Sequence, residues 1–573
     1  MNCQTDRRTA WGWAGLLVAC LVAAADFGMH YGVSNQNVYL LAGLRAMHPG
    51  LWDHDWFAAH TYQYHHLFSA LIPILARLGP LPWIIEGLNL LVVVVSLVAL
   101  RTLFLILCPR HASTATLLLM VAVVAQQTRS VGSTYLYSEI LQPSTLAVCG
   151  MLLAVVYFLR ARYVVSGLFL ALGATFHANY IILGILVFGL AHLAIGWQGL
   201  FRRGAAQLLP VTLVLLRELP VFLALASAPQ QQLSMDIFTR IRAPHHYYPL
   251  SFLADYLGFG GWILLGLAAA TPADRQSAFL RRLQGLQLAL VALVTVSTLL
   301  TTVVFVPRVA MLFLLRAAPF SVLLAQILVV RAIIAKLAGD PPDLAGPWPA
   351  WRRRLWLAGL LLPLVRAGLH RPTANDLVLP LLLLGGTLTY LWWKWHTPSG
   401  ALPPPAAVRI VPPLVAVPVL GAFLLVSLVQ STVLHGVGTP AEHGLYSWAR
   451  TTSPDAVFLV PPGLLDFRLQ SERAVVVDWK ATPVLSGEVL EWYRRVGRIT
   501  GDATVRTLPY AEQAYGRLRP DAIASLSREF GAGYAVFRLP YPDTTRSAFR
   551  NDRFVVLDLR PGPESASPKH PRP

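Results

Sequence analysis

Long apolar runs alternate with short polar segments along most of the chain. The runs recur at lengths near the roughly 20 residues that an α-helix needs to cross the hydrocarbon core of a bilayer. This pattern predicts a mainly α-helical, polytopic membrane protein with about thirteen spans. We place them near residues 11–27, 83–108, 112–127, 140–159, 163–176, 179–197, 206–228, 251–270, 284–305, 308–330, 354–370, 376–393 and 408–433. The apolar run 67–79 is too short to span and predicts an interfacial or re-entrant helix.

The pattern changes after residue 434. Helical stretches near 440–451, 486–497 and 521–530 alternate with short β-type runs at 456–460, 474–478, 534–538 and 554–557. This alternation predicts a small α/β domain over residues 435–559. The Pro- and Ser-rich residues 560–573 are expected to form a disordered tail. The transmembrane domain would then be residues 1–434, with a first external loop at 28–82.

Charge gives the expected orientation in the membrane. The chain has 573 residues and a net charge of +18, but only 13% of its residues are charged. Residues 1–434 contain 28 Lys and Arg against 13 Asp and Glu, while the remainder contains 18 against 15. The excess therefore lies in membrane loops, where it sets topology, and does not indicate nucleic-acid binding. The distribution predicts a cytoplasmic N-terminus and an extracytoplasmic C-terminal domain.

Candidate chemistry begins in the first external loop. Residues 52–66 read Trp-Asp-His-Asp-Trp-Phe-Ala-Ala-His-Thr-Tyr-Gln-Tyr-His-His. Asp53 and Asp55 are candidates for a catalytic base or for ligands of a divalent cation, Mg²⁺ or Mn²⁺, although two carboxylates do not identify an ion. The alternative is an interfacial loop in which the aspartates only cap the next helix.

Other unusual polar residues fall on the same predicted side of the membrane. Arginine forks bind phosphate and histidines donate to it or transfer protons. Each residue also has a structural alternative, such as a rigid proline-flanked loop at 242–249. We expect a substrate site for an anionic lipid from His54, His65, His66, Glu139, His177, Asn179, Arg240, Arg242, His245, His246, Arg308 and Arg316. Asp26 is a weaker candidate for the catalytic carboxylate than Asp53 or Asp55, and Arg217 with Glu218 favours a structural pair.

This arrangement resembles the GT-C superfamily, the integral-membrane glycosyltransferases that use polyprenyl-phosphate-linked sugars. The resemblance lies in an acidic first external loop, many spans and an external C-terminal domain. It implies that Asp53 or Asp55 acts as base or metal ligand. The Trp-Trp-Asp-Tyr-Gly motif of the oligosaccharyltransferase members is absent from residues 435–573, so transfer to protein asparagines is not supported.

A closer resemblance is to an uncharacterised bacterial branch, a domain-of-unknown-function family with GT-C-like architecture. It implies a location in the bacterial inner membrane and does not identify the sugar or the acceptor. The matching segments are Leu-Trp-Asp-His-Asp-Trp-Phe (51–57), Arg-Ala-Pro-His-His-Tyr-Tyr-Pro (242–249), Phe-Leu-Val-Pro-Pro (458–462), Phe-Arg (467–468) and Val-Val-Val-Asp-Trp-Lys (475–480).

Two other hypotheses remain open at this stage. A transporter or flippase for a lipid-linked or anionic solute would use Arg217, Glu218 and Arg316 to line a path. A non-catalytic scaffold for envelope assembly would act through residues 435–573 and would tolerate changes in the external loops.

Overall fold

The computed structural model describes residues 13, 15–17, 19–21, 30–125, 130–226, 229–271, 276–338, 349–369, 438–541 and 547–560. Asp26, most of the predicted span 11–27, the predicted spans 376–393 and 408–433, and residues 561–573 of the predicted tail lie outside them. The chain divides into two compact units. Unit 1 contains residues 1–29, 85–224 and 243–435, and unit 2 contains residues 30–84, 225–242 and 436–573.

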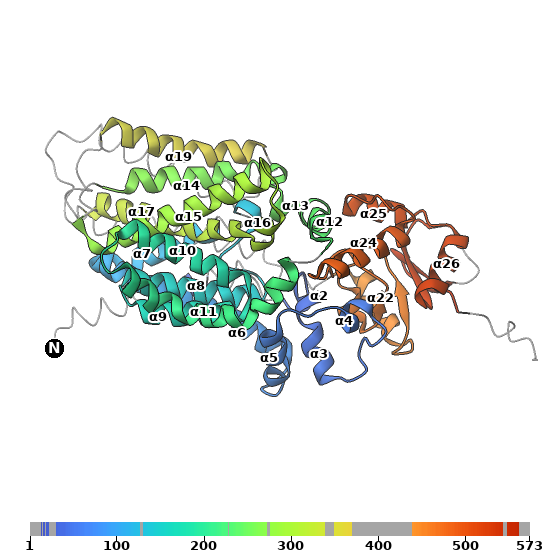
Figure 1. Ribbon diagram of the computed structural model, residues 1–573. Coiled ribbons are helices and arrows are strands. Elements are labelled where there is room, and N and C mark those ends of the chain that lie inside the picture. Colours follow the sequence, from blue (N-terminus) through green and yellow to red (C-terminus); the bar gives the residue numbers. More distant parts are fainter. Residues whose placement is uncertain are drawn as a thin grey trace, which may run out of the picture. The chain divides into compact units, whose positions relative to one another are not determined.

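Unit 1 is built from long apolar helices (Figure 1). Most begin and end within several residues of a predicted span, because runs of apolar side chains continue until polar or helix-breaking residues interrupt them. The predicted span 308–330 is instead divided between two helices. The helices are α6 (Leu81–Leu107), α7 (Ala112–Ala125), α8 (Pro143–Leu159), α9 (Tyr163–Phe176), α10 (Asn179–Ile195), α11 (Leu200–Ala226), α14 (Asp255–Ala269), α15 (Ala278–Thr302), α16 (Pro307–Leu312), α17 (Ala318–Ala338) and α19 (Ala350–Leu369).

Exposure of apolar surface supports a membrane environment for this unit. Among the described residues, four helical segments are long and apolar enough to cross a bilayer: Leu81–Leu107, Leu200–Ala224, Ala278–Thr302 and Pro307–Ala335. Along α11, Leu209, Leu213 and Leu216 are all exposed. Contiguous apolar surface of this kind requires an apolar surrounding or a partner. The fold class predicted from the sequence, a mainly α-helical polytopic protein, is confirmed.

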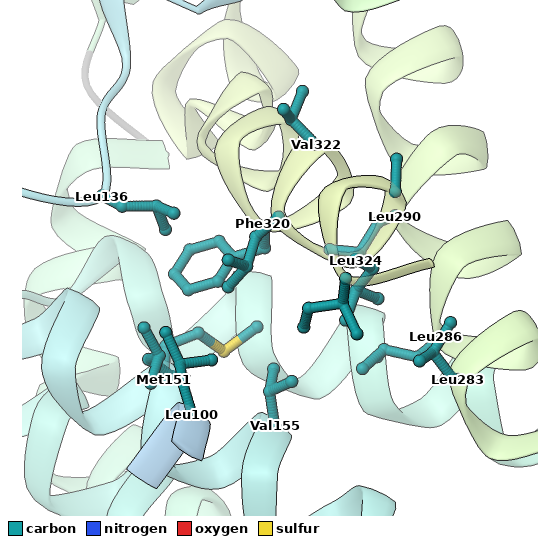
Figure 2. Packing of buried hydrophobic residues seen from close by; sticks show 14 of the residues in the cluster. Leu100, Leu136, Met151, Val155, Leu283, Leu286, Leu290, Phe320, Val322 and Leu324 are labelled. Carbon is teal, nitrogen blue, oxygen red and sulfur yellow. The ribbon is translucent and has the colours of Figure 1, made fainter. Parts of the chain in front are cut away.

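The core of unit 1 surrounds α17. Phe320 of α17 points toward Leu136 and Met151, within one continuous cluster of buried apolar side chains (Figure 2). Helices α8 and α9 approach especially closely where two glycines face each other. A Cβ atom at Gly150 would lie 2.6 Å from the Cα atom of Gly173. Small residues allow such close backbone approach in membrane helix pairs.

Unit 2 combines the first loop with the C-terminal residues. The loop forms four short helices: α2 (Gln36–Tyr39), α3 (Leu41–Met47), α4 (Trp56–His60) and α5 (His66–Ala76). Helix α5 lies where the interfacial helix was predicted. Several hydrogen bonds join the loop to distant residues. For example, Trp52 Nε1 donates to the Arg468 carbonyl at 3.2 Å, and Tyr62 N donates to Glu488 Oε1 at 2.9 Å. The segment 225–242 adds α12 (Gln231–Asp236) and a π-helical turn, η3 (Ile237–Arg242).

The C-terminal part of unit 2 is an α/β domain, as predicted. Its strands are β1 (Val457–Leu459), β2 (Ala474–Val475), β3 (Tyr534–Arg538), β4 (Ser547–Arg550) and β5 (Phe554–Asp558), and its helices are α22 (Pro440–Arg450), α23 (Phe467–Ser471), α24 (Ser486–Thr500), α25 (Leu508–Tyr515) and α26 (Pro520–Phe530). The sheet order is β2-β1-β3-β5-β4. Strand β1 pairs in parallel with β2 and β3, whereas β5 is antiparallel to β3 and β4. Strand β4 was not predicted, because an edge strand that is largely exposed has no apolar periodicity.

Candidate functional site

A break in a long apolar helix is the starting point in unit 1. Helix α16 ends at Phe313, whose backbone is left-handed with φ 46° and ψ 52°, and a 3₁₀ turn, η6 (Leu314–Ala317), leads into α17. A left-handed conformation costs a bulky L-residue about 1–2 kcal/mol. The side-chain amide of Asn179, the first residue of α10, donates to the carbonyls of Met311 at 3.3 Å and Leu312 at 3.4 Å. A polar side chain therefore satisfies backbone groups at the break, as apolar surroundings require.

This role predicts a loss of stability when Asn179 no longer donates. We expect Asn179→Ala to lower the free energy of unfolding by about 1 kcal/mol, the usual net contribution of a hydrogen bond. Asn179→Asp should cost more, because its oxygens would face two carbonyl oxygens. Thermal unfolding of the purified full chain measures both changes. Equal stability of the Asp variant and the wild type would contradict this role.

Arg316 follows the break by three residues. Its guanidinium carbon lies 4.9 Å from the ring centroid of Phe313 and 5.4 Å from that of Tyr180. Within the described residues, its Nε and Nη1 atoms are buried and have no hydrogen-bond partner. A guanidinium group donates five hydrogen bonds and does not lose its charge. Buried N–H groups without acceptors are costly, so this arginine is suited to an anionic ligand.

Histidine side chains surround the same break. Because a carbonyl only accepts, His246 donates from Nδ1 to the Gly132 carbonyl, at 2.8 Å. Its ring lies 5.4 Å from the Phe313 ring and 4.1 Å from the His245 ring. On the other side, His177 lies 5.8 Å from the Tyr180 ring. Gly132 has φ +70°, and a Cβ atom there would lie 3.1 Å from the His246 carbonyl oxygen, so this turn favours glycine.

Five of the predicted substrate-binding residues thus meet around Phe313. We call them, together with Tyr180, the Arg316 cluster: His177, Asn179, His245, His246 and Arg316. Glu139 and Arg308, also predicted to bind substrate, are exposed. Within the described residues, neither makes a hydrogen bond or ion pair with this cluster.

In unit 2, the two candidate catalytic aspartates have different surroundings. Asp55 is completely buried and caps α4, since its Oδ1 accepts from Ala58 N at 2.8 Å. Its Oδ2 accepts from Arg468 Nε at 2.7 Å and from Val475 N at 2.9 Å. Asp53 is exposed and pairs with Arg45 at 2.9 Å. The helix-cap alternative therefore describes Asp55 correctly.

Asp53 and Asp55 therefore have separate surroundings. Both oxygens of Asp55 accept hydrogen bonds from N–H groups, and the Arg468 guanidinium lies against its Oδ2. No group of three His, Cys, Asp or Glu side chains in the described part of the chain could hold a metal ion. The catalytic or metal-binding role expected of these two aspartates stays a prediction.

The ion pair of Asp55 continues to a second carboxylate. Arg468 Nη1 donates to Asp478 Oδ2 at 2.5 Å, and Arg468 and Asp478 are each 2% exposed. Asp478 Oδ1 accepts from the backbone N–H groups of Lys480 and Ala481, both at 2.7 Å. Burial by itself lowers the pKa of Arg468, but the two carboxylates more than offset this effect and raise it. We call Asp55, Arg468 and Asp478 the buried ion triad.

The remaining predicted residues of unit 2 fall into two groups. Arg242 donates from Nε to Thr482 Oγ1 at 2.8 Å and from Nη2 to the Lys480 carbonyl at 2.9 Å. Arg240 is exposed and lies 3.5 Å from Asp236. Arg242 belongs to unit 2, whereas His245 and His246 belong to unit 1.

The three histidines of the first loop have separate surroundings. His54 is exposed and lies 3.5 Å from Asp455. His65 is buried against the rings of Tyr39, at 4.7 Å, and Tyr64, at 4.2 Å. His66 is exposed, with Nε2 3.2 Å from the Tyr62 hydroxyl. These contacts favour anchoring roles for His65 and His66, the structural alternative.

Lys480 and Asp466 were not predicted from the sequence. Burial, and next the Arg242 cation, lower the pKa of Lys480 to about 8, against the opposing effect of Asp478 and Asp466. Burial raises the pKa of Asp466, although Asn37 donates a hydrogen bond to it. Perturbed titration of this kind often marks functional sites. Two features of the sequence could have indicated Lys480. The chain has 42 Arg but only four Lys, and Lys480 lies in the segment 475–480 that matches the bacterial branch.

Comparison with known proteins gives matches to the fold. A family model described as a domain of unknown function, DUF6798, matches residues 441–499. No curated protein matches the chain significantly. The ArnT of Cupriavidus metallidurans bound to undecaprenyl phosphate is 14% identical, with a TM-score of 0.48, and the match covers 96% of this chain and 98% of that one.

A second solved structure is the archaeal oligosaccharyltransferase AglB from Archaeoglobus fulgidus, in complex with an inhibitory peptide and a dolichol-phosphate. It is 11% identical, with a TM-score of 0.42, and the match covers 92% of this chain and 69% of that one. Both proteins are GT-C glycosyltransferases, the superfamily that the sequence resembles. At these identities and scores, neither match assigns an activity to this chain.

Proposed function

We propose that the protein is a membrane glycosyltransferase that takes a sugar from a polyprenyl-phosphate donor, and that the Arg316 cluster binds the phosphate of this donor. The observation that carries the proposal is that two guanidinium nitrogens of Arg316, Nε and Nη1, are buried and have no acceptor among the described residues. The donor class is the one that the sequence resemblance implies.

The chemistry of transfer explains why a fixed arginine is useful. The oxygen of an acceptor hydroxyl attacks the anomeric carbon and gives up its proton to water. The bond from that carbon to the phosphate oxygen breaks, and its electron pair leaves with the polyprenyl phosphate. Negative charge therefore grows on the phosphate as the bond breaks. Preorganised donors at that point stabilise the transition state more than the ground state. Arg316 is held against Phe313 and Tyr180, and His246 is oriented by the Gly132 carbonyl.

Several groups of the cluster suit a lipid-borne phosphate. An arginine fork matches phosphate oxygens bidentately. His246, whose Nδ1 donates to the Gly132 carbonyl, donates from Nε2 to a phosphate only in its doubly protonated, cationic form. The cluster belongs to a unit with apolar helical surface suited to a lipid environment. The surroundings of Asp55 do not favour it as the proton acceptor, and Asp53 is already paired with Arg45.

The test is donor cleavage by the purified full chain in nanodiscs. The donor is an undecaprenyl-phosphate-linked sugar, the acceptor source is a membrane extract, and the product measured is released undecaprenyl phosphate. We expect release that depends on the extract. If the protein instead moves the intact donor across proteoliposomes and releases no product, it is a transporter. If it neither cleaves nor moves the donor, the scaffold hypothesis is favoured.

A further inference from the structure

Charged side chains from two segments of unit 2, residues 225–242 and 436–573, lie beside Lys480. Arg242, from the segment 225–242, binds the Lys480 carbonyl and so fixes one cation next to another. Asp478 Oδ1 accepts a hydrogen bond from the Lys480 backbone N–H, at 2.7 Å. Within the described residues, the Lys480 ammonium itself has no hydrogen bond or ion pair. The lysine is therefore positioned through its backbone while its side chain is left available.

Asp466 and Asn37 form the second half of this group. The Asn37 amide donates to Asp466 Oδ1, joining the first loop to residues more than 400 positions later. Asn37 is 1% exposed, and its own Oδ1 is buried without a hydrogen-bond partner among the described residues. Buried acceptors are nearly always satisfied, so a lone amide oxygen indicates a place where a donor from a ligand binds.

We propose that Asp466, Lys480 and Asn37 form a proton-exchanging site that binds a neutral ligand bearing hydroxyl groups. The Asn37 oxygen accepts a hydrogen bond from one hydroxyl of the ligand. The Asp466 carboxylate takes a proton from a ligand hydroxyl: the O–H bond breaks, the proton goes to the carboxylate and the electron pair stays on the ligand oxygen. Lys480, which is partly exposed, exchanges that proton with solvent in its neutral form.

Charge balance decides the ligand class. Asp478 and Asp466 act on Lys480, and Glu442 and Asp478 act on Asp466. The fourth acidic group is Asp55, which belongs to the same ion triad as Asp478. The basic groups are Lys480, Arg242 and Arg468. Four acids against three bases leave no attraction for an anion such as phosphate. Transfer of a proton from the ligand to Asp466 leaves the total charge of the site and its ligand unchanged.

The use of lysine at this position supports proton exchange. The chain places Arg at 42 of its 46 basic positions. A guanidinium remains charged at every physiological pH, whereas a lysine beside another cation loses its proton readily. Burial and Arg242 act in that direction on the pKa of Lys480, and burial acts on the pKa of Asp466 in the direction that favours proton uptake.

This inference goes beyond the proposed function, and no step of it depends on cleavage of the sugar donor. The proton-exchanging pair can be tested without any activity. A lysine titration in the intact protein measures it directly, because the chain has only four lysines.

The experiment is a ¹³C-NMR titration of the full chain in nanodiscs after reductive ¹³C-methylation of its lysines. The Lys480→Arg variant assigns one resonance by its loss. We expect this resonance to titrate near pH 8, against about 10.4 for a lysine in water. Arg242→Gln should raise the midpoint and Asp466→Asn should lower it, while Arg240→Gln, which removes an exposed arginine two residues away, should leave it unchanged.

A Lys480 midpoint above pH 10 that does not change in the Arg242→Gln variant would show that Lys480 and Asp466 do not form a proton-exchanging pair. If Arg242→Gln fails to fold, Arg242→Lys keeps the cation and should leave the midpoint near pH 8. Normal donor cleavage together with such an ordinary lysine would contradict this inference alone. Absent donor cleavage with a midpoint near pH 8 would contradict the proposed function alone.

The ligand class is tested at pH 8 with two probes, methyl β-D-glucopyranoside and inorganic phosphate. We expect the glycoside, but not phosphate, to shift the Lys480 resonance, and Asn37→Ala to abolish the shift while Lys480 still titrates below pH 9. A response to phosphate alone, or to neither probe, would show that the site does not bind neutral hydroxylated ligands.

Discussion

Replacing Arg468 with methionine is expected to destabilise unit 2 by about 3–5 kcal/mol, the cost of removing one partner from a buried ion pair. The reason is the charge that remains: Asp55 and Asp478 are buried and would face each other without a cation. Their carboxylates would also lose two hydrogen bonds to the guanidinium. Thermal unfolding of the full chain measures the loss. Hydrogen exchange at the Ala58 and Val475 amides, which donate to Asp55, reports it locally.

A matched control separates burial from charge. Arg498→Met removes an arginine of α24 that pairs with Glu529 at the surface, where side-chain exposure is 50% and 27%. Surface pairs contribute only about 0–1 kcal/mol, so this variant should remain close to the wild type. The triple variant Asp55→Asn, Arg468→Met, Asp478→Asn should recover part of the stability lost by Arg468→Met, because no uncompensated charge remains. Equal stability of the two single variants would show that the triad does not hold unit 2 together.

The helices of unit 1 could be predicted because their cause is local. A run of apolar side chains specifies a span by its own length, and α8, α9 and α10 end close to the predicted positions. Strands β1, β3 and β5 could also be predicted, since each is buried and continuously apolar. Helices α23 and α25 were missed because they are short and have weak periodicity, so packing decides their conformation.

The candidate sites depend on pairings that no local pattern contains. Asp55 and Arg468 are separated by 413 positions, so the sequence could suggest that Asp55 caps a helix but could not supply its cation. For the same reason, the sequence alone could not distinguish whether Asp55 is a catalytic base or a buried carboxylate that pairs with a cation. Histidine pairs at 65–66 and 245–246 also look alike in sequence, yet His65 packs between two tyrosines and His246 lies against the broken helix.

The convergence around Phe313 was expected only in part. The sequence indicated that His177, Asn179, His246 and Arg316 share one side of the membrane, and these residues do meet. It did not indicate the helix break that brings them together. A phenylalanine in the left-handed region carries no signal in the sequence, because glycine or asparagine is the usual residue there. The strain at Phe313 is offset by its contacts with His246, Tyr247 and Arg316.

Changing Arg316 is expected to give the largest functional effect. Arg316→Gln should weaken binding of undecaprenyl phosphate, the lipid product of the proposed reaction, by about 10- to 100-fold. This corresponds to the about 1.5–3 kcal/mol that a hydrogen bond to a charged group contributes. Donor cleavage should fall at least as much, because charge on the phosphate grows in the transition state. Arg316→Lys should lie between the two, since it keeps the charge but loses the bidentate fork.

Arg308 provides the matched control for this prediction. It lies eight positions earlier in the same apolar segment and is exposed. Arg308→Gln therefore removes one arginine charge and leaves every residue of the Arg316 cluster unchanged. We expect this variant to bind undecaprenyl phosphate within about twofold of the wild type, as an exposed and screened charge should. Native mass spectrometry of the full chain with added lipid measures binding. Wild-type binding by Arg316→Gln, or an equal loss in both variants, would mean that the phosphate binds elsewhere and that the Nε and Nη1 groups of Arg316 have another role.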